Sequence, residues 1–226
     1  MEKDRLRLRL FIIDAPSPMD LLQNRSEALA LEKVCALIGH EVSTFTVKSI
    51  LEFETVCKFI AAIDADHDQY KRQGVPLCVH IAAHGNKDGL GIGPELVDWK
   101  RFHQLLQPLC TDLNRYDGPV IMVISACRAS HQKLTREFKK QFKQDSKLCP
   151  PAYLFITADD EPSFDDAAVS WTVFYHQLPG VSLDDRAKVR AILRRVKESG
   201  AATLKYYRWD THEKSYRQYT PKPHTR

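Results

Sequence analysis

Short runs of apolar residues, each about the length of one buried strand, constrain the fold of this chain more than any other feature. Residues 77–83 and 119–126 are almost wholly apolar, which is typical of strands covered on both faces of a sheet. Residues 6–13, 42–47 and 152–158 have a similar length and are predicted as further strands. Segments with helical periodicity separate the five runs. The sequence therefore predicts an α/β fold with a largely parallel central sheet and helices on both faces.

Helix start signals lie between these runs. Ser17, Pro18 and Asp20 form the pattern of an N-cap serine, a proline at the first helical position and an acid three residues after the cap. Further helix starts are predicted at Ser49, Asp98, Ser163 and residues 182–185.

Two hairpins are predicted in addition to the parallel strands. Residues 90–96 follow turn-forming residues and are expected to form a small hairpin. Residues 204–209 and 216–219 look like late strands that pair at an edge of the sheet. No convincing linker interrupts the pattern, so we expect one domain over residues 1–226.

Composition excludes several classes of protein. The chain has 226 residues, 43% of them apolar, which is enough for one sizeable core. The net charge is only +4 and the two signs are interspersed, so nucleic acid and membrane are not expected as partners. No secretory signal and no membrane span are expected, because the N-terminus is charged and no apolar run approaches about 18 residues.

The six cysteines are widely scattered and none forms a C-x-x-C pair. This distribution suggests neither a disulfide framework nor a zinc site, and no EF-hand spacing occurs. We therefore expect a cytoplasmic protein with mostly free thiols, no cofactor and no metal.

Reactive or charged side chains follow the predicted strands, at the edge where open α/β sheets form their sites. These residues are Asp14, His84 with Gly85, Cys127, and Asp159 with Asp160. A nucleophilic cysteine needs a nearby base or imidazolium to gain thiolate character. If the strands that end at His84 and Cys127 are neighbours, their side chains face one gap. The pattern alone leaves open that they are two unrelated polar strand ends.

The sequences around these two residues resemble a known family. Residues 79–85 (VHIAAHG) and 123–128 (VISACR) are similar to the His-Gly and Ala-Cys motifs of caspase-like, clan CD, cysteine peptidases. Ala129 stands where caspases usually have Gly, and Ser125 where they have Gln, so the prokaryotic caspase-like branch is the closer match. The resemblance covers roughly residues 6–177 and implies a three-layer caspase-like domain.

The resemblance also implies a mechanism. Cys127 would attack the scissile carbonyl, and His84 would act as general acid toward the leaving amine. The backbone N–H groups of Gly85 and Cys127 would bind the oxyanion. The family needs no third catalytic residue, and none is predicted. His80, His103 and His176 are expected to be structural.

The substrate side-chain pocket implied by the family draws on Asp14, Ser125, Asp159 and Asp160. Caspases place arginines there to bind aspartate, whereas this chain places acids. The hypothesis is cleavage after Arg or Lys. Alternatively, Asp14 and Asp160 cap helices or accept loop N–H groups.

The predicted α/β fold also supports two other classes of function. A catalytically silent scaffold on the same fold is one alternative. A nucleotide-binding module is disfavoured because no Gly-rich loop follows the first strand. The resemblance further implies protein substrates, regulation by a separate activator protein, autocleavage or dimerisation, and a role in bacterial immunity or cell death. The basic residues 133–147 form either an exposed processing loop or a solvated helix face.

Overall fold

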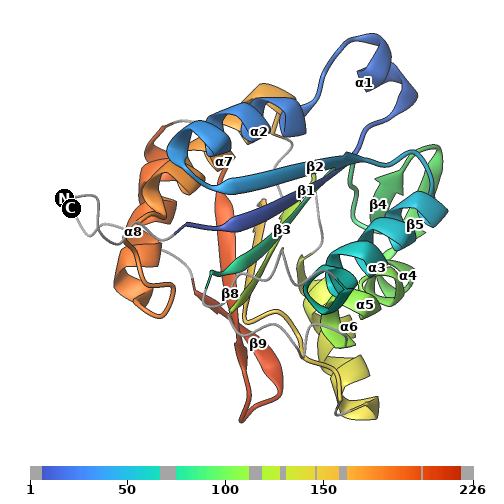
Figure 1. Cartoon of the computed structure of the whole chain (residues 1–226). Coiled ribbons are helices and arrows are strands. Elements are labelled where there is room, and N and C mark those ends of the chain that lie inside the picture. The colour runs from blue at the N-terminus through green and yellow to red at the C-terminus, as the bar shows by residue number, and fades with distance from the viewer. Residues whose placement is uncertain are drawn as a thin grey trace.

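A seven-stranded sheet with the order β2-β1-β3-β6-β7-β8-β9 runs through the middle of the molecule (Figure 1). The computed structural model describes residues 7–66, 75–111, 119–127, 131–145, 147–157, 162–199 and 201–219. The strands from β2 to β7 in this order are parallel, and β8 and β9 continue the sheet antiparallel. The bounds are β1 (Arg9–Ala15), β2 (Glu41–Thr46), β3 (Leu77–Ala83), β6 (Val120–Ser125), β7 (Tyr153–Thr157), β8 (Leu204–Asp210) and β9 (Ser215–Tyr219).

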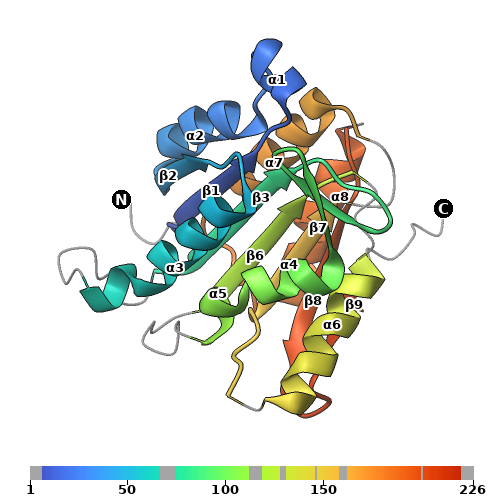
Figure 2. The same cartoon turned by 90° about the vertical axis from the view of Figure 1, so that its right-hand side faces the viewer.

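Helices cover both faces of this sheet, so the predicted three-layer α/β architecture is confirmed (Figures 1 and 2). One face carries α2 (Glu27–Ile38), α7 (Phe164–Gln177) and α8 (Arg186–Glu198). The opposite face carries α3 (Ile50–Asp66), α4 (Trp99–Leu105), α5 (Gln107–Thr111) and α6 (His131–Gln144). The short helix α1 (Pro18–Leu22) joins β1 to α2, and a small hairpin of β4 (Gly89–Ile92) and β5 (Glu95–Asp98) follows β3.

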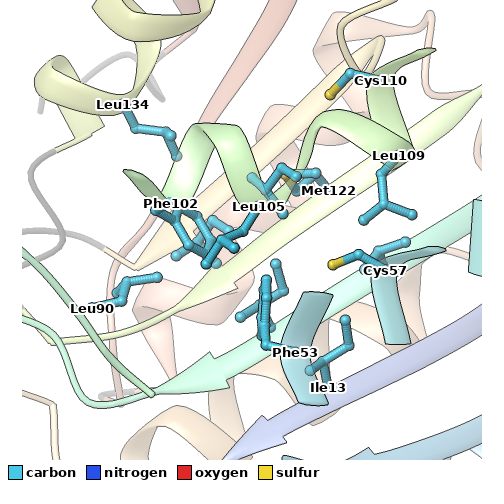
Figure 3. Close-up of a cluster of buried hydrophobic side chains, with 14 of the residues drawn as sticks. Ile13, Phe53, Cys57, Leu90, Phe102, Leu105, Leu109, Cys110, Met122 and Leu134 are labelled. Carbon is cyan, nitrogen blue, oxygen red and sulfur yellow. The ribbon is translucent and has the colours of Figure 1, made fainter. Parts of the chain in front are cut away.

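Alternate side chains of each central strand enter opposite cores. Met122 and Ile124 of β6 belong to the core under α3 to α6. Figure 3 shows Met122 in this cluster together with Phe53 and Phe102. Ile121 and Val123 point into the core under α2, α7 and α8. Burial on both faces explains why these strands read as continuous apolar runs rather than as alternating patterns.

Most of the predicted local signals are confirmed. Ser17 and Ser163 form capping boxes with Asp20 and Asp166, and Asp98 is the N-cap of α4. The β4–β5 hairpin and the β8–β9 edge hairpin both form. At the start of α8 the N-cap within the predicted stretch 182–185 is Asp185.

The basic segment after Cys127 requires a correction. Residues 131–144 form the amphipathic helix α6, so the processing-loop interpretation is wrong for this part of the segment. The buried side chains Leu134 and Phe138 pack on the sheet, while the lysines alternate with them on the outer face. Spacing of apolar residues by three or four positions produces this arrangement.

Across the described ranges, every helix is too short or too polar to cross a bilayer.

Candidate active site

The strands that end at His84 and Cys127 are neighbours. β3 and β6 are adjacent in the sheet (Figure 2) and pair in parallel. Ala82 lies opposite Ser125, so His84 and Cys127 each lie two positions beyond this pair at the same edge. The backbones converge at this point. A Cβ atom at Gly85 would lie 2.5 Å from the Cys127 carbonyl oxygen, closer than real Cβ atoms approach. Only glycine permits this contact without a shift of the backbone.

His84 and Cys127 line one cavity of about 100 Å³ at this edge of the sheet, which we call the edge cavity. Asp14 and Ser125, two of the residues predicted to bind substrate, line the same cavity. Asp159 and Asp160, the other two, lie outside the described residues.

His84 is held on one side of its ring by a carboxylate. Its Nε2 lies 2.6 Å from Asp20 Oδ2, and its ring meets that of Phe164 edge-on at 5.3 Å. The side chain is 46% exposed, so the ring is fixed in orientation and still open to the edge cavity. Asp20 is therefore part of the site, although the sequence indicated it only as a capping residue of α1.

Asp20 is itself fixed by the start of α1. Its Oδ2 accepts hydrogen bonds from the Ser17 backbone N–H (2.8 Å) and from the Ser17 hydroxyl (2.6 Å). Burial acts to raise the pKa of Asp20, but the hydrogen bonds from Ser17 and His84 outweigh it and leave this pKa below its usual value. The carboxylate is consequently ionised at neutral pH.

The backbone before Cys127 is braced by Thr157 of β7. The Thr157 hydroxyl accepts the Ala126 N–H at 3.1 Å and donates to the Ala126 carbonyl at 2.6 Å. The half-buried Cys127 thiol donates to the Pro162 carbonyl with a sulfur–oxygen distance of 3.4 Å. A rigid backbone therefore presents the sulfur to the edge cavity.

The predicted oxyanion donors lie at the same convergence. Gly85 bridges to Leu90, and the flanking bonds of this bridge run from Gly91 N–H to His84 O and from Asn86 N–H to Gly89 O. Within the described part of the chain, the Gly85 N–H donates no hydrogen bond to another backbone group. An N–H group without a backbone acceptor is the type of donor that an oxyanion site requires.

Ser125 belongs to a buried hydrogen-bond network that forms the floor of the edge cavity. Its hydroxyl donates to Glu27 Oε2 and accepts from Trp171 Nε1, both at 2.8 Å. Glu27 Oε1 lies 2.9 Å from His80 Nε2, and His80 Nδ1 lies 2.9 Å from the Tyr175 hydroxyl. We call these five residues the floor network. His80 is fully buried within it, which fits the structural role expected for this histidine.

Asp14 occupies the wall of the edge cavity with 6% of its surface exposed. Its Oδ2 accepts a hydrogen bond from the Ser26 hydroxyl at 2.7 Å. Burial raises the pKa of Asp14, and the nearby carboxylates Glu27 and Asp20 add to the shift, while the Ser26 hydrogen bond opposes it. The ionised form of Asp14 would be stabilised by a cation entering the cavity.

The edge cavity is therefore acidic. Three carboxylates line it (Asp14, Asp20 and Glu27), and none of its described lining residues is Lys or Arg. Among the described residues there is also no cluster of three or more His, Cys, Asp or Glu side chains suited to hold a metal ion.

Two residues of the site were missed by the sequence reasoning. Glu27 follows the N-cap Ser26 of α2, and nothing in its local sequence marks it as facing the strand ends. Asp20 carried a local signal, its capping box, but this signal explains only its place in α1.

Neither a search of known protein-family models nor a search of curated proteins finds a match to this chain.

Proposed function

We propose that this chain is a cysteine endopeptidase of the caspase-like kind, in which Cys127 is the nucleophile and His84 the general acid. The observation that carries this proposal is that both side chains line one cavity at the ends of adjacent parallel strands, where the Gly85 backbone lies against Cys127. Acyl transfer by a cysteine requires a thiol nucleophile and a nearby imidazole, both accessible to substrate in a cleft.

The reaction would proceed in two halves. The Cys127 thiolate attacks the peptide carbonyl carbon, and the oxygen takes the negative charge beside the N–H groups of Gly85 and Cys127. The C–N bond then breaks as His84 gives its proton to the leaving amine, which leaves a thioester. Water attacks the thioester and transfers a proton to His84, the C–S bond breaks, and the acid product leaves.

The acidic cavity favours a basic side chain at the position before the cleaved bond, Arg or Lys. Asp14 is the best-placed partner for this cation, because its carboxylate is buried and accepts a single hydrogen bond from a described residue, Ser26. Ser125 and Glu27 would form the base of the pocket. A neutral or acidic side chain would leave the buried Asp14 carboxylate without an opposite charge.

The biological setting follows from the resemblance alone. We propose protein substrates, a cytoplasmic location, control by a separate activator protein and a place in a regulated defence or cell-death pathway of bacteria. Nucleic acid is not proposed as a partner, because the two charge signs are mixed along the chain.

A peptide panel tests the function. Fluorogenic peptides that differ only in having Arg, Lys, Asp or Leu before the cleaved bond are incubated with the wild type and with Cys127→Ala. We expect cleavage after Arg and Lys, with the variant inactive. Preference for Asp or Leu would refute the basic specificity.

Intact-mass analysis of the purified proteins adds an independent readout. Self-cleavage that the Cys127→Ala variant lacks would report both activity and the cleaved sequence. Absence of cleavage in every substrate, together with failure of a peptide warhead to label Cys127, would instead favour the alternative, a catalytically silent scaffold.

A further inference from the structure

We infer that Asp20 is a positioning residue for His84, so that the site works as a Cys127–His84–Asp20 triad rather than as a pair. This inference rests on the proposed function and adds to it a residue that the family resemblance does not supply. Three observations carry it: the contact with the imidazole, the way Asp20 is anchored, and the contrast with a second capping box in the same chain.

The contact with Asp20 decides which ring nitrogen of His84 can serve the sulfur. A carboxylate only accepts hydrogen bonds, so Nε2 at 2.6 Å from Asp20 Oδ2 carries a proton. In the neutral ring the proton on Nε2 leaves the lone pair on Nδ1. Nδ1 is then the atom that accepts the thiol proton and later returns it to the leaving amine. The edge contact with Phe164 limits rotation away from this orientation.

The anchoring of Asp20 makes it an effective support. Both Ser17 groups donate to the same Oδ2 that accepts from His84, and the carboxylate is 5% exposed. The two hydrogen bonds from Ser17 therefore fix the Asp20 side chain independently of its contact with His84. This fixed acceptor holds the proton of His84 on Nε2, so the Nδ1 lone pair stays available to the thiol of Cys127.

A second capping box provides the internal contrast. Ser163 and Asp166 at the start of α7 repeat the arrangement of Ser17 and Asp20: the Ser163 hydroxyl donates to Asp166 Oδ2 at 2.6 Å, and the Asp166 N–H donates to Ser163 Oγ at 3.2 Å. In the described part of the chain, no histidine is hydrogen-bonded to Asp166. Capping alone therefore needs no imidazole partner, and Asp20 makes one contact beyond it.

Asp166→Asn is consequently a matched control for Asp20→Asn. Both substitutions weaken a capping box at the start of a helix, but only Asp20→Asn changes the hydrogen-bond partner of the His84 ring. An asparagine that turns its amide N–H₂ toward Nε2 would also favour the tautomer with the proton on Nδ1, the one that cannot accept the thiol proton.

The test follows the alkylation rate of Cys127 by iodoacetamide against pH, with no peptide substrate present and with the modified cysteine identified by peptide mass mapping. The other titratable groups that line the cavity are Asp14 and Glu27, and both are unchanged in the variants. For the wild type and Asp166→Asn we expect reactivity well below the pKa of an isolated thiol, about 8.5. For Asp20→Asn the rise should move toward that value.

Peptide hydrolysis provides the second readout. We expect Asp20→Asn to lower kcat about 10- to 100-fold with little change in KM, and Asp166→Asn to change kcat less than about twofold. Asp20→Asn profiles that coincide with those of the wild type in both assays would overturn the inference and leave the peptidase proposal intact. A shifted alkylation profile in a protein that cleaves no peptide would support the inference and remove the peptidase function.

A measurement on the wild type covers the case in which Asp20→Asn fails to fold. Nitrogen NMR of ¹⁵N-histidine-labelled protein identifies the His84 tautomer directly, with assignment by the His84→Gln variant. A neutral ring protonated on Nε2 is expected. A ring protonated on Nδ1 would overturn the inference without any use of the Asp20 variant.

Discussion

Two histidines close together in the chain show how different surroundings give one residue type two roles. His80 lies within β3 and His84 directly follows this strand, and each is bonded to a carboxylate from the segment that follows β1. His80 is fully buried in the floor network, and both of its ring nitrogens have partners. His84 is 46% exposed, and Asp20 is the one hydrogen-bond partner of its ring among the described residues.

The difference teaches that a histidine–carboxylate pair does not by itself identify a catalytic base. In the floor network the buried polar side chains are hydrogen-bonded to one another, so removal of any member leaves buried polar atoms without partners. At the rim of the edge cavity, one ring nitrogen of His84 is available to a reacting group. We therefore expect substitutions in the floor network to lower stability and substitutions at the rim to lower activity.

The largest expected effects come from substituting each histidine. His84→Ala should lower kcat/KM about 10²- to 10⁴-fold, because general acid–base catalysis is lost, while the free energy of unfolding changes little. His80→Ala should lower the free energy of unfolding by about 3–5 kcal/mol, because Glu27 loses its buried partner. Peptidase kinetics and urea unfolding of both variants test this comparison. It would be wrong if His80→Ala mainly lowered activity and His84→Ala mainly lowered stability.

A second prediction tests whether the rim depends on geometry as well as on chemistry. Gly85→Ala would place a Cβ atom 2.5 Å from the Cys127 carbonyl oxygen, so the two strand ends must move apart. A displacement of about 1 Å at a catalytic group can lower the rate about 100-fold, and we expect a loss of this size in kcat/KM.

Gly91→Ala is the control for this substitution. Gly91 also lies near His84, but a Cβ atom there would be 3.6 Å from its nearest neighbour, the His84 Cβ, an ordinary contact. Its activity should stay close to that of the wild type. Equal kinetics for Gly85→Ala and Gly91→Ala would contradict the role given to the close approach of the two backbones.

The smallest expected effect concerns Asp14, which lies beside both the rim and the floor network. Because its pKa is raised in the folded state, its ionised form lowers stability once the pH rises through that raised value, and no penalty exists below the unfolded pKa of about 3.9. Asp14→Asn should therefore raise Tm at pH 7 by about 2–4 °C, the shift that about 1 kcal/mol produces in a chain of this size.

Thermal unfolding at pH 7 and near pH 3 checks this prediction. The gain in Tm should vanish near pH 3, where the wild-type carboxyl is protonated, and the Asp166→Asn variant should show no gain at either pH. Cleavage after Arg should weaken in Asp14→Asn. A variant less stable than the wild type at pH 7 would show that Asp14 is satisfied in the free protein.

The sequence was informative where the signal is local. Continuous apolar runs predicted the buried strands, and serine with an acid three residues later predicted the starts of α1 and α7. The ends of β3 and β6 could be chosen as a candidate site because open α/β sheets collect polar groups at this edge.

The sequence was uninformative where contacts join distant segments. Asp20 and His84 are 64 residues apart, and Glu27 and His80 are 53 apart. No pattern within one helix or strand predicts either pair, because the residues meet only through the order of the strands and the path of α1 and α2. For the same reason Ser125, predicted as a substrate contact, could not be recognised as a member of a buried network.

The three carboxylates of the edge cavity, Asp14, Asp20 and Glu27, all come from residues 14–27, whereas the sulfur and the imidazole come from the ends of β6 and β3. Charge and reactivity are thus encoded in separate stretches of the gene. Under the proposed function, replacing this one connection with that of another protein would change the preferred cleavage position without changing the cysteine or the histidine. The same exchange would remove the support of the imidazole, so altered selectivity and altered turnover would be inherited together.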